Sequence, residues 1–425
     1  MPLVTHAPIS LLPTPFPRSA YLFAKRLQVS VFAFNLTFGF VNACLHQPLF
    51  NLLVHRISIH PTFLDEVCQS VAEVDTFTAA LYAVYQQTRT PVQPIVLGIH
   101  RSDYLLHQQQ PGAEPVPQQV ELNTIASSFS SLSYLTSQLH RHLLSSSTST
   151  SSLLPQLAET ASDRSLADAI AEAWRLYSAA AHGAVPGAVV VMIVQPGEKN
   201  AFDQRWIEYQ LAKLHGIKLL RKTLLEMATG ARVGLDHTLY LTDGQQNDIG
   251  VAVVYYRAGY TPVDYPSDKE WAARLLIEQS SAIKCPSIAY HLAGLKKVQQ
   301  VLALPGQVEK FMSPEESAQL RASFTGLFPL SDDAAGLAAV ELALANPAAY
   351  VLKPQREGGG NNFYNEQVKE MLLKLTPKER SAYILMERIL PPSNPGKVLR
   401  KGVLSEYPTV SELGIYGCFI GYDEK

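Results

Sequence analysis

A run of three glycines stands between charged and amide side chains in the sequence LKPQREGGGNNFY, residues 352–364. Because glycine has no side chain, the N–H groups of Gly358, Gly359 and Gly360 could approach a ligand closely. Lys353 precedes the glycines and Glu357 adjoins them, a combination that suits a phosphate group and a metal ion. Neither G-x-x-x-x-G-K-[ST] nor G-x-G-x-x-G is present. The residues alone leave two interpretations open, a phosphate-binding loop and a flexible surface turn.

A second candidate site lies in the sequence VELN, where Glu121 and Asn123 alternate along an apparent strand. Side chains two residues apart project from the same face of a strand. Carboxylate and amide oxygens are hard ligands of the kind that magnesium prefers. The pattern is equally typical of a solvated strand face, so the spacing alone does not decide between the two.

The elements that must position these residues fall into three stretches. Up to about residue 180 the pattern is helical, interrupted by a serine-rich run at 145–152 that suits a solvated loop. Continuous apolar runs at 187–196 and 249–257 are typical of buried strands. Between them a helix is predicted, with Ile207, Leu211 and Leu214 on one face. Strand, helix and strand at this spacing predict a parallel α/β domain at 187–297.

The third stretch contains the glycine run. A helix is predicted over 332–347, with Ser331 as its N-cap and Pro347 just past its end. The strand-like AYVLKPQ precedes the glycines, and residues 365–375 and 381–389 predict a helix and a further strand. The order of elements is therefore strand, glycine loop, helix, strand.

Composition limits the classes of function. The chain has 425 residues and a net charge of −2, which predicts two or three domains and gives no electrostatic reason for a nucleic acid or an anionic membrane as main partner. Its four cysteines are far apart and show no zinc-ligand spacing. This favours a reducing compartment and buried thiols.

An uncharged apolar segment, Val29–Leu45, permits three interpretations. It is near the lower length limit for a membrane span, although Asn35, Gly39 and Asn42 weaken that interpretation. It could instead be a buried apolar segment. The third interpretation is an inserted piece, residues 29–47, that does not belong to the fold.

Ordered sequence blocks along nearly the whole chain, from about residue 7, resemble one family. Besides KPQREGGGNNFY, they are GIHRSDY (98–104), VELNTIASSF (120–129), NAFDQRWIE (200–208), VVYYRAGY (253–260), CPSIAYHLAGLKKVQQ (285–300), ILMERI (384–389) and SELGIYG (411–417). Together they resemble the eukaryotic-type glutathione synthetases, members of the ATP-grasp superfamily.

The resemblance implies an α/β fold with an α+β body: an ATP-grasp fold with a glycine-rich lid and an inserted parallel α/β substrate-binding domain. The implied division is 1–186 for the first part of the body, 187–297 for the inserted domain, and 298–425 for the last part, with a lid around 335–390. The implied reaction is ATP-dependent peptide ligation. ATP phosphorylates the cysteinyl carboxylate of γ-glutamylcysteine, and the amine of glycine then attacks the acyl phosphate to give glutathione, ADP and phosphate.

The resemblance also implies roles for individual residues. Magnesium would be bound by Glu121, Asn123 and Glu357. Catalysis would involve Arg101, Lys353, Gly358 and Gly359. The nucleotide would contact Glu121, Lys296, Lys353, Glu357, Gly358, Gly359, Gly360, Asn361, Asn362, Tyr364, Met386, Glu387, Arg388, Ile389 and Glu412, whereas Lys297 is expected to be solvated. The peptide would contact Arg101, Ala126, Ser127, Ser128, Glu198, Asn200, Gln204, Arg257 and Tyr260. Arginines suit its carboxylates because the guanidinium fork binds them with two hydrogen bonds.

Three departures from the family pattern stand out. Residues 125–129 read IASSF where the family pattern is ISASF, so Ala126 lacks a hydroxyl. Deleting residues 29–47 joins two helix-like stretches that match the family, which suggests a retained intron or an error in the gene model. The chain ends at residue 425, where the family continues with an Arg-x-Lys pair and a small-residue loop. Without that charged clamp we expect little or no ligase activity from this polypeptide.

The expected protein is a cytoplasmic homodimer whose cofactor is Mg²⁺ and whose co-substrate is ATP. Three rival hypotheses remain. One is a ligase that joins γ-glutamylcysteine to another acceptor, such as β-alanine or serine. Another is a truncated, inactive nucleotide-binding product, and the third is a membrane-tethered form that uses Val29–Leu45.

Overall fold

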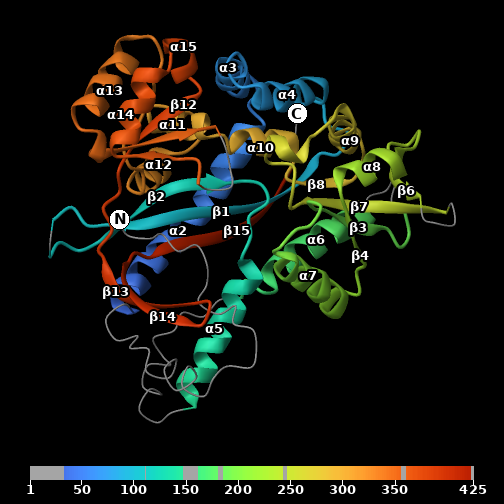
Figure 1. The fold of residues 1–425 in the computed structure, drawn as a ribbon. Coiled ribbons are helices and arrows are strands. Elements are labelled where there is room, and N and C mark those ends of the chain that lie inside the picture. Colours follow the sequence, from blue (N-terminus) through green and yellow to red (C-terminus); the bar gives the residue numbers. More distant parts are fainter. Residues whose placement is uncertain are drawn as a thin grey trace.

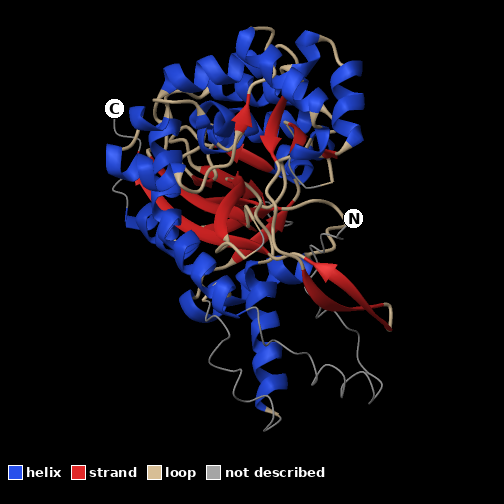
Figure 2. Cartoon of the chain, turned by 90° about the vertical axis from the view of Figure 1, so that its left-hand side faces the viewer, coloured by secondary structure: helices blue, strands red, loops and turns tan. Residues whose placement is uncertain are grey.

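The computed structural model describes residues 33–110, 112–146, 161–179, 185–242, 247–355 and 360–422. These residues form an α/β fold in which several sheets are covered by helices (Figures 1 and 2). The predicted α/β class is thus confirmed. The predicted domain boundaries at 186/187 and 297/298 stay a prediction.

The central sheet is antiparallel and has the order β15-β1-β2. Its strands are β1 (Ile95–His107), β2 (Val116–Asn123) and β15 (Glu412–Tyr422). The long helix α2 (Ala33–Ser58) packs against this sheet, and Figure 1 shows it crossing the strands. The expectation of a helical pattern up to residue 180 was therefore too simple, because β1 and β2 both lie within that stretch.

The second sheet contains the predicted parallel unit. Strands β3 (Val189–Ile193), β4 (Leu219–Lys222), β7 (Asp248–Tyr256) and β8 (Ile283–Cys285) are parallel, and β5 (Ala231–Val233) and β6 (Leu239–Thr242) extend the sheet in antiparallel fashion. All five residues of β3 are buried, as the apolar run predicts. The helices of this region are α6 (Ser165–Ala179), α7 (Ala201–Gln210), α8 (Leu224–Gly230) and α9 (Asp268–Glu278).

The predicted face of the 207–214 helix is only partly correct. Ile207 and Leu211 are fully buried, but Leu214 is 46% exposed. Helix α7 ends at Gln210, and a π-helical turn, Leu211–His215, follows it. The wider turn changes the angle between successive side chains, so Leu214 no longer lies on the buried face.

A third sheet, with the order β11-β10-β12-β9, forms most of the predicted lid. It consists of β9 (Leu327–Phe328), β10 (Tyr350–Pro354), β11 (Phe363–Tyr364) and β12 (Tyr383–Glu387). Helices α13 (Ala334–Ala345) and α14 (Glu366–Lys374) pack on it around a separate apolar core. The predicted order of elements is confirmed, with the short β11 added before α14.

Ser331 is not the N-cap of α13. The side chain of Asp333 accepts a hydrogen bond from Gly336 N at 2.8 Å, and the Ser331 hydroxyl donates to Asp333 at 2.9 Å. The carboxylate is therefore the cap, and the helix begins at Ala334. Pro347 lies past the end of the helix, as predicted.

The remaining α-helices of the described residues are α3 (Pro61–Ala72), α4 (Thr76–Gln87), α5 (Ser130–Ser145), α10 (Ile288–Ala293), α11 (Lys296–Ala303), α12 (Pro314–Arg321) and α15 (Pro377–Arg380). The remaining strands are β13 (Asn394–Arg400) and β14 (Val403–Thr409), which pair with each other. Figure 1 shows α5 extending away from the body.

The apolar segment Val29–Leu45 lies partly outside the described residues. From Ala33 onward it belongs to α2, where Ala43 is fully buried. None of the described helices is long and apolar enough to cross a membrane. The hypothesis that residues 29–47 are an insertion stays a prediction. Most of the serine-rich run, from residue 147, also lies outside the described part.

Candidate active site

Four polar side chains share one face of the central sheet. In the register of β1 and β2, Arg101 is opposite Asn123 and Asp103 is opposite Glu121. The guanidinium of Arg101 donates from Nε and Nη2 to the two carboxylate oxygens of Asp103, at 2.6 and 2.7 Å. Asn123 Nδ2 donates to the same carboxylate at 2.9 Å. Asp103 thus fixes the orientation of both Arg101 and Asn123.

Two lysines from distant segments approach Glu121. Lys296, the first residue of α11, places its Nζ 3.4 Å from Glu121 Oε2. Lys353 in β10 donates from Nζ to the carbonyl of Val120, the residue before Glu121, at 2.8 Å. Burial alone would raise the pKa of Glu121, but Lys296, Lys353 and Arg101 lower it to about 2. The carboxylate is therefore ionised at neutral pH, and its surroundings carry excess positive charge.

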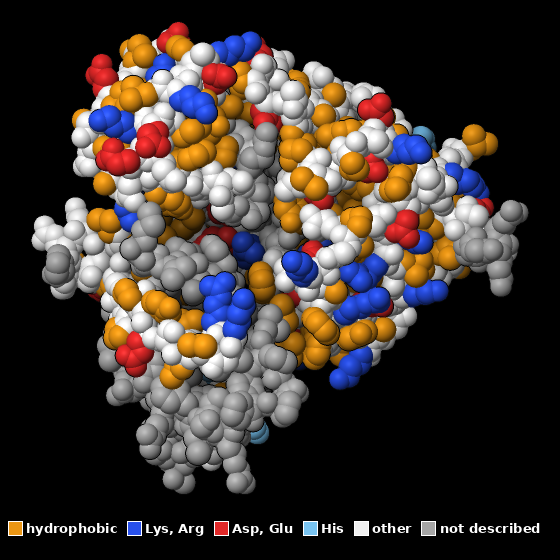
Figure 3. Space-filling view, in the orientation of Figure 1, with side chains coloured by type: hydrophobic (Ala, Val, Ile, Leu, Met, Phe, Trp, Pro, Cys, Tyr) orange, Lys and Arg blue, Asp and Glu red, His pale blue; other side chains and the backbone are white. Residues whose placement is uncertain are grey.

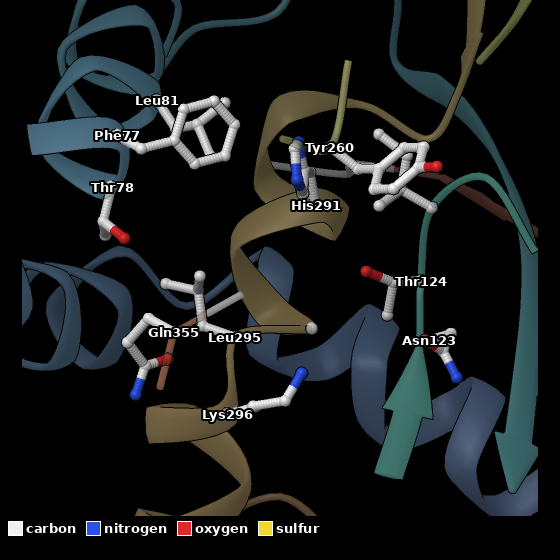
Figure 4. Close-up of a pocket in the computed structure, with 12 residues that line it drawn as sticks. Phe77, Thr78, Leu81, Asn123, Thr124, Tyr260, His291, Leu295, Lys296 and Gln355 are labelled. Carbon is white, nitrogen blue, oxygen red and sulfur yellow. The ribbon is translucent and has the colours of Figure 1, made fainter. Parts of the chain in front are cut away.

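A small cavity of about 20 Å³ adjoins this cluster between α4, the end of β2 and the α10–α11 turn. Asn123, Lys296, Tyr260 and Gln355 are among its lining residues, and Figure 4 shows Lys296 and Asn123 on the same side of it. Figure 3 shows a hollow at the centre of the molecule, with acidic and basic side chains inside.

Lys297, expected to be solvated, is half-buried, and its backbone N–H donates to Gln355 Oε1 at 3.1 Å.

The turn at 126–128 leads from β2 of the central sheet to helix α5. Ala126 has a left-handed backbone conformation, with φ of 56°. The carbonyl of Ser128 accepts hydrogen bonds from Arg101 Nη1, at 3.2 Å, and from the hydroxyl of Tyr416 in β15. Ser127 is buried, and its hydroxyl has no hydrogen-bond partner in the described structure.

Asp203, at the start of α7, binds the backbone of the residues that follow this turn. Its carboxylate accepts hydrogen bonds from the backbone N–H groups of Phe129, Ser131 and Leu132, at 3.0, 3.0 and 3.2 Å. Arg257, which follows β7, lies 3.2 Å from the same carboxylate. The first turn of α5 and the carboxyl end of β7 are therefore held by one buried carboxylate.

The other predicted peptide-binding residues lie around α7. Gln204 is fully buried, and its Oε1 accepts a hydrogen bond from Arg221 in β4. Glu198 Oε1 accepts from the backbone N–H of Asn200 at 2.6 Å. Tyr260 donates its backbone N–H to Asp264 at 3.1 Å and lines the cavity of Figure 4.

The predicted nucleotide-binding residues of the lid are more dispersed than the predicted peptide-binding residues. Met386 and Ile389 are buried, whereas Tyr364 is 39% exposed. Arg388 Nη1 donates to Asn365 at 3.0 Å, and Glu387 N donates to the carbonyl of Gly326 at 2.8 Å.

The remaining predicted nucleotide residues lie at the glycine run and at the start of β15. Gly360 and Asn361 are exposed, and Asn362 Nδ2 donates to the Tyr364 hydroxyl at 3.5 Å. Glu412 lies in the central sheet at the exposed start of β15, opposite Leu105. Glu357, Gly358 and Gly359 lie outside the described residues.

Sequence reasoning missed four residues of this region: Asp103, Asp203, Arg221 and Tyr416. Asp103, Asp203 and Tyr416 stand inside blocks that resemble the family. The two-residue spacing of Arg101 and Asp103 on a strand was a usable signal, because it places both side chains on one face. The partners of Asp203, Arg221 and Tyr416 are 17 or more positions away in the chain, and no local pattern reveals them.

The described residues contain no group of three or more His, Cys, Asp or Glu side chains that could hold a metal ion. Glu121 and Asn123 do lie on the same face of β2, as predicted. The third predicted ligand, Glu357, lies outside the described part.

Comparisons with known proteins agree over almost the whole chain. Residues 32–425 match the family model described as eukaryotic glutathione synthase, ATP binding domain. The chain is 42% identical to the chloroplastic glutathione synthetase of Arabidopsis thaliana, covering 98% of this chain and 71% of that protein. It is 39% identical to glutathione synthetase of Homo sapiens, covering 98% and 82%.

A solved structure is also similar. The apo form of a glutathione synthetase-like effector, GSS30 from Globodera pallida, superposes with a TM-score of 0.70 at 25% identity and covers 97% of this chain and 83% of that one. By its family model, its relatives and its fold, the chain belongs to the eukaryotic glutathione synthetase family.

Proposed function

We propose that this protein ligates γ-glutamylcysteine to glycine at the expense of ATP, through an acyl phosphate. The observation that carries the proposal is the approach of Lys296 and Lys353 to the ionised carboxylate of Glu121. A carboxylate is a poor electrophile until it is phosphorylated. Fixed cations can stabilise the negative charge that develops during phosphoryl transfer, and membership of the family supplies the reaction class.

The ammonium groups of Lys296 and Lys353 would bind the phosphates of ATP, in place of the present contacts with Glu121 and the Val120 carbonyl. Glu121 and Asn123 fit a magnesium ion in ligand chemistry, because an ionised carboxylate and an amide lie on one strand face. Glu357 would be the third ligand. When bound, the ion would neutralise phosphate charge.

The lid would cover the nucleotide. Gly358, Gly359, Gly360, Asn361 and Asn362 would close over the phosphates, and Tyr364, Met386, Glu387, Arg388, Ile389 and Glu412 would contact the rest of ATP. The burial of Met386 in β12 and of Ile389 just after it is consistent with an apolar wall for the base.

The peptide would lie between the two sheets. Arg101 is held with its guanidinium towards the 126–128 turn, where it could bind the reacting carboxylate. Asn200, Gln204, Arg257 and Tyr260 would bind the remainder of the peptide, and Glu198 would receive its α-ammonium group. Closing the lid would exclude water from the acyl phosphate.

We also propose a cytoplasmic homodimer. All four cysteines are free thiols, which suits a reducing compartment. The dimer rests on the family resemblance, and light scattering of the purified protein tests it.

The decisive experiment measures ADP release by the purified chain with each substrate omitted in turn. We expect slow release by the 425-residue chain, and any release should require both γ-glutamylcysteine and glycine, with glutathione identified by mass spectrometry. Replacing glycine by β-alanine or serine tests acceptor choice. Hydroxylamine in place of glycine should trap the acyl phosphate as a hydroxamate. ADP release without peptide dependence would contradict the proposal.

A further inference from the structure

Several buried hydrogen-bond donors in or near α7 have no hydrogen-bond partner among the described residues. They include Gln204 Nε2, Arg221 Nε and Arg257 Nε, and Trp206 Nε1 and Arg257 Nη1 share this state. A buried donor without an acceptor costs about 1–3 kcal/mol, so such groups are rare in folded proteins unless they serve a ligand. Their concentration in one region suggests that a ligand with several acceptor oxygens completes the site.

These donors lie at the carboxyl ends of parallel strands. Arg221 is near the end of β4, opposite Met192 of β3, and Arg257 directly follows β7 and donates its N–H to the carbonyl of Ile193. Ligands of open parallel sheets bind in the crevice outside the carboxyl ends of the strands. Lys and Arg side chains gather on this face over α7 and β4 (Figures 1 and 3).

The electrostatic surroundings of Arg221 are compatible with a bound anion. Burial lowers the pKa of its guanidinium, and Arg205 and Arg257 lower it further, against the opposing effects of Glu208 and Glu198. Arg205 forms an ion pair with Glu208 at 2.7 Å, and Arg257 forms one with Asp203 at 3.2 Å. Arg221 donates from Nη2 to the neutral amide of Gln204.

This site is linked to the reaction centre by one side chain. The hydroxyl of Tyr416 donates to the carbonyl of Ser128, which also accepts from Arg101. Arg101, Asp203 and Arg257 all influence the pKa of Tyr416, which burial raises to about 12. Arg101, Tyr416, Arg257 and Arg221 therefore follow one another from the central sheet to the edge of the parallel sheet.

We propose that Arg221 binds the α-carboxylate of the γ-glutamyl group, while the reacting carboxylate lies near Arg101. Neither the sequence blocks nor their resemblance assigns Arg221 a role. The γ-glutamyl end is a zwitterion, and Glu198, which lies within electrostatic reach of Arg221, would receive its ammonium group. The assignment rests on the proposed peptide site and makes Arg221 a determinant of specificity for γ-glutamyl substrates.

The test compares two peptides by calorimetry on the purified chain under reducing conditions. One is γ-glutamylcysteine, and the other is γ-aminobutyrylcysteine, which lacks only the α-carboxylate. In Arg221→Gln the dissociation constant of γ-glutamylcysteine should rise about 10- to 100-fold, the loss of a charge-assisted hydrogen bond. That of γ-aminobutyrylcysteine should change less than about threefold, because this peptide has nothing for Arg221 to bind.

Arg232→Gln is the matched control, because Arg232 is an exposed arginine of the same sheet paired with Asp248. It should bind both peptides like the unmodified protein. Arg221→Lys retains the charge but loses the planar fork, so an intermediate loss is expected. If Arg221→Gln does not fold, the unmodified protein still tests the proposal: it should bind γ-aminobutyrylcysteine at least about tenfold more weakly than γ-glutamylcysteine.

Equal losses for both peptides would mean that Arg221 only maintains the fold around Gln204, and this would overturn the assignment. So would unchanged binding of γ-glutamylcysteine by Arg221→Gln. If the unmodified protein binds neither peptide but binds ATP, the proposed peptide site itself fails, and the Arg221 assignment fails with it.

Discussion

Asp203 and Arg257 form an ion pair that is almost completely removed from solvent, with 3.2 Å between Oδ2 and Nη1 and side-chain exposures of 0% and 2%. The same carboxylate accepts three N–H groups at the start of α5. Desolvation of a buried pair is costly, but these three hydrogen bonds help to offset the cost for the carboxylate. The pair therefore connects the start of α5 to the carboxyl end of β7.

The first prediction is that Asp203→Asn strongly destabilises the protein. The amide has nearly the shape of the carboxylate, but it leaves the buried guanidinium of Arg257 without its counter-ion. Removing one partner of a buried pair costs about 3–5 kcal/mol in free energy of unfolding. Urea unfolding measures this loss.

Asp248→Asn is the control, because Asp248 pairs with Arg232 at the surface, where such a pair contributes about 0–1 kcal/mol. Equal losses in the two variants would contradict the view that burial makes the Asp203 pair critical.

The second prediction concerns acid. The pKa of Glu121 is lowered from 4.5 to about 2, so its ionised form stabilises the fold above about pH 4.5, and this stabilisation is lost as the pH falls towards about 2. A shift of that size corresponds to about 3 kcal/mol. In Lys296→Met the pKa of Glu121 should rise, so the variant should lose part of this stabilisation at pH 7 and show a shallower decline between pH 5 and 2.

Urea unfolding at a series of pH values measures this difference, and other carboxylates cancel because both proteins contain them. Lys297→Met is the control, because Lys297 lies near Asp333 rather than beside Glu121. Parallel pH profiles for Lys296→Met and the unmodified protein would show that Lys296 does not set the pKa of Glu121.

The third prediction uses the close contact between Gly294 and Thr124. A Cβ atom on Gly294 would lie 2.2 Å from Thr124 Oγ1, and the α10–α11 turn that contains Gly294 leads to Lys296. Gly294→Ala should therefore lower the free energy of unfolding by about 1–3 kcal/mol. It should also weaken ATP binding, because the turn must move.

Adding Thr124→Ala removes the hydroxyl and leaves Thr124 Cβ at 3.1 Å, so the double variant should recover part of the loss. Gly230→Ala is the control, because nothing lies within 4 Å of its Cβ position in α8. A double variant less stable than the sum of the single changes would exclude the steric explanation.

The sequence predicted what depends on local pattern. Continuous apolar residues gave β3 and β7, and the alternation of Glu121 with Asn123 placed both on one face of β2. The resemblance then supplied Lys296 and Lys353, which no spacing connects to Glu121. What could not be predicted depends on tertiary contacts. Tyr416 reaches Ser128 only because β15 pairs with β1, a contact between residues far apart in the chain.

Two predictions about the ends of helices were wrong for reasons that hydrophobic spacing does not reveal. Ser331 was expected to cap α13, but its hydroxyl bonds to Asp333, which is the stronger acceptor and takes the cap. Leu214 was expected to be buried, but a π-helical turn after Gln210 directs it outward. The first outcome depends on competition between two neighbouring polar groups and the second on a local change of helix type, and hydrophobic spacing predicts neither.

The last prediction concerns Ala126, which has a φ of 56° where the family pattern has serine. A left-handed conformation costs an L-residue roughly 1–2 kcal/mol, and glycine avoids this cost but loses about 0.4–1 kcal/mol through the entropy of the unfolded chain. Ala126→Gly should therefore leave the free energy of unfolding unchanged or raise it by at most about 1.6 kcal/mol.

Ala126→Val should destabilise the protein by more than about 1 kcal/mol, because a β-branched side chain is disfavoured at positive φ. Valine should also weaken binding of γ-glutamylcysteine, because the turn positions the Ser128 carbonyl that Arg101 and Tyr416 contact. Ala126→Ser should resemble the unmodified protein in both measurements, since the turn needs a small residue and the Arg101 contact uses the backbone. If serine instead improves peptide binding severalfold while stability is unchanged, the missing hydroxyl itself contacts the peptide, and the backbone conformation is not what position 126 contributes.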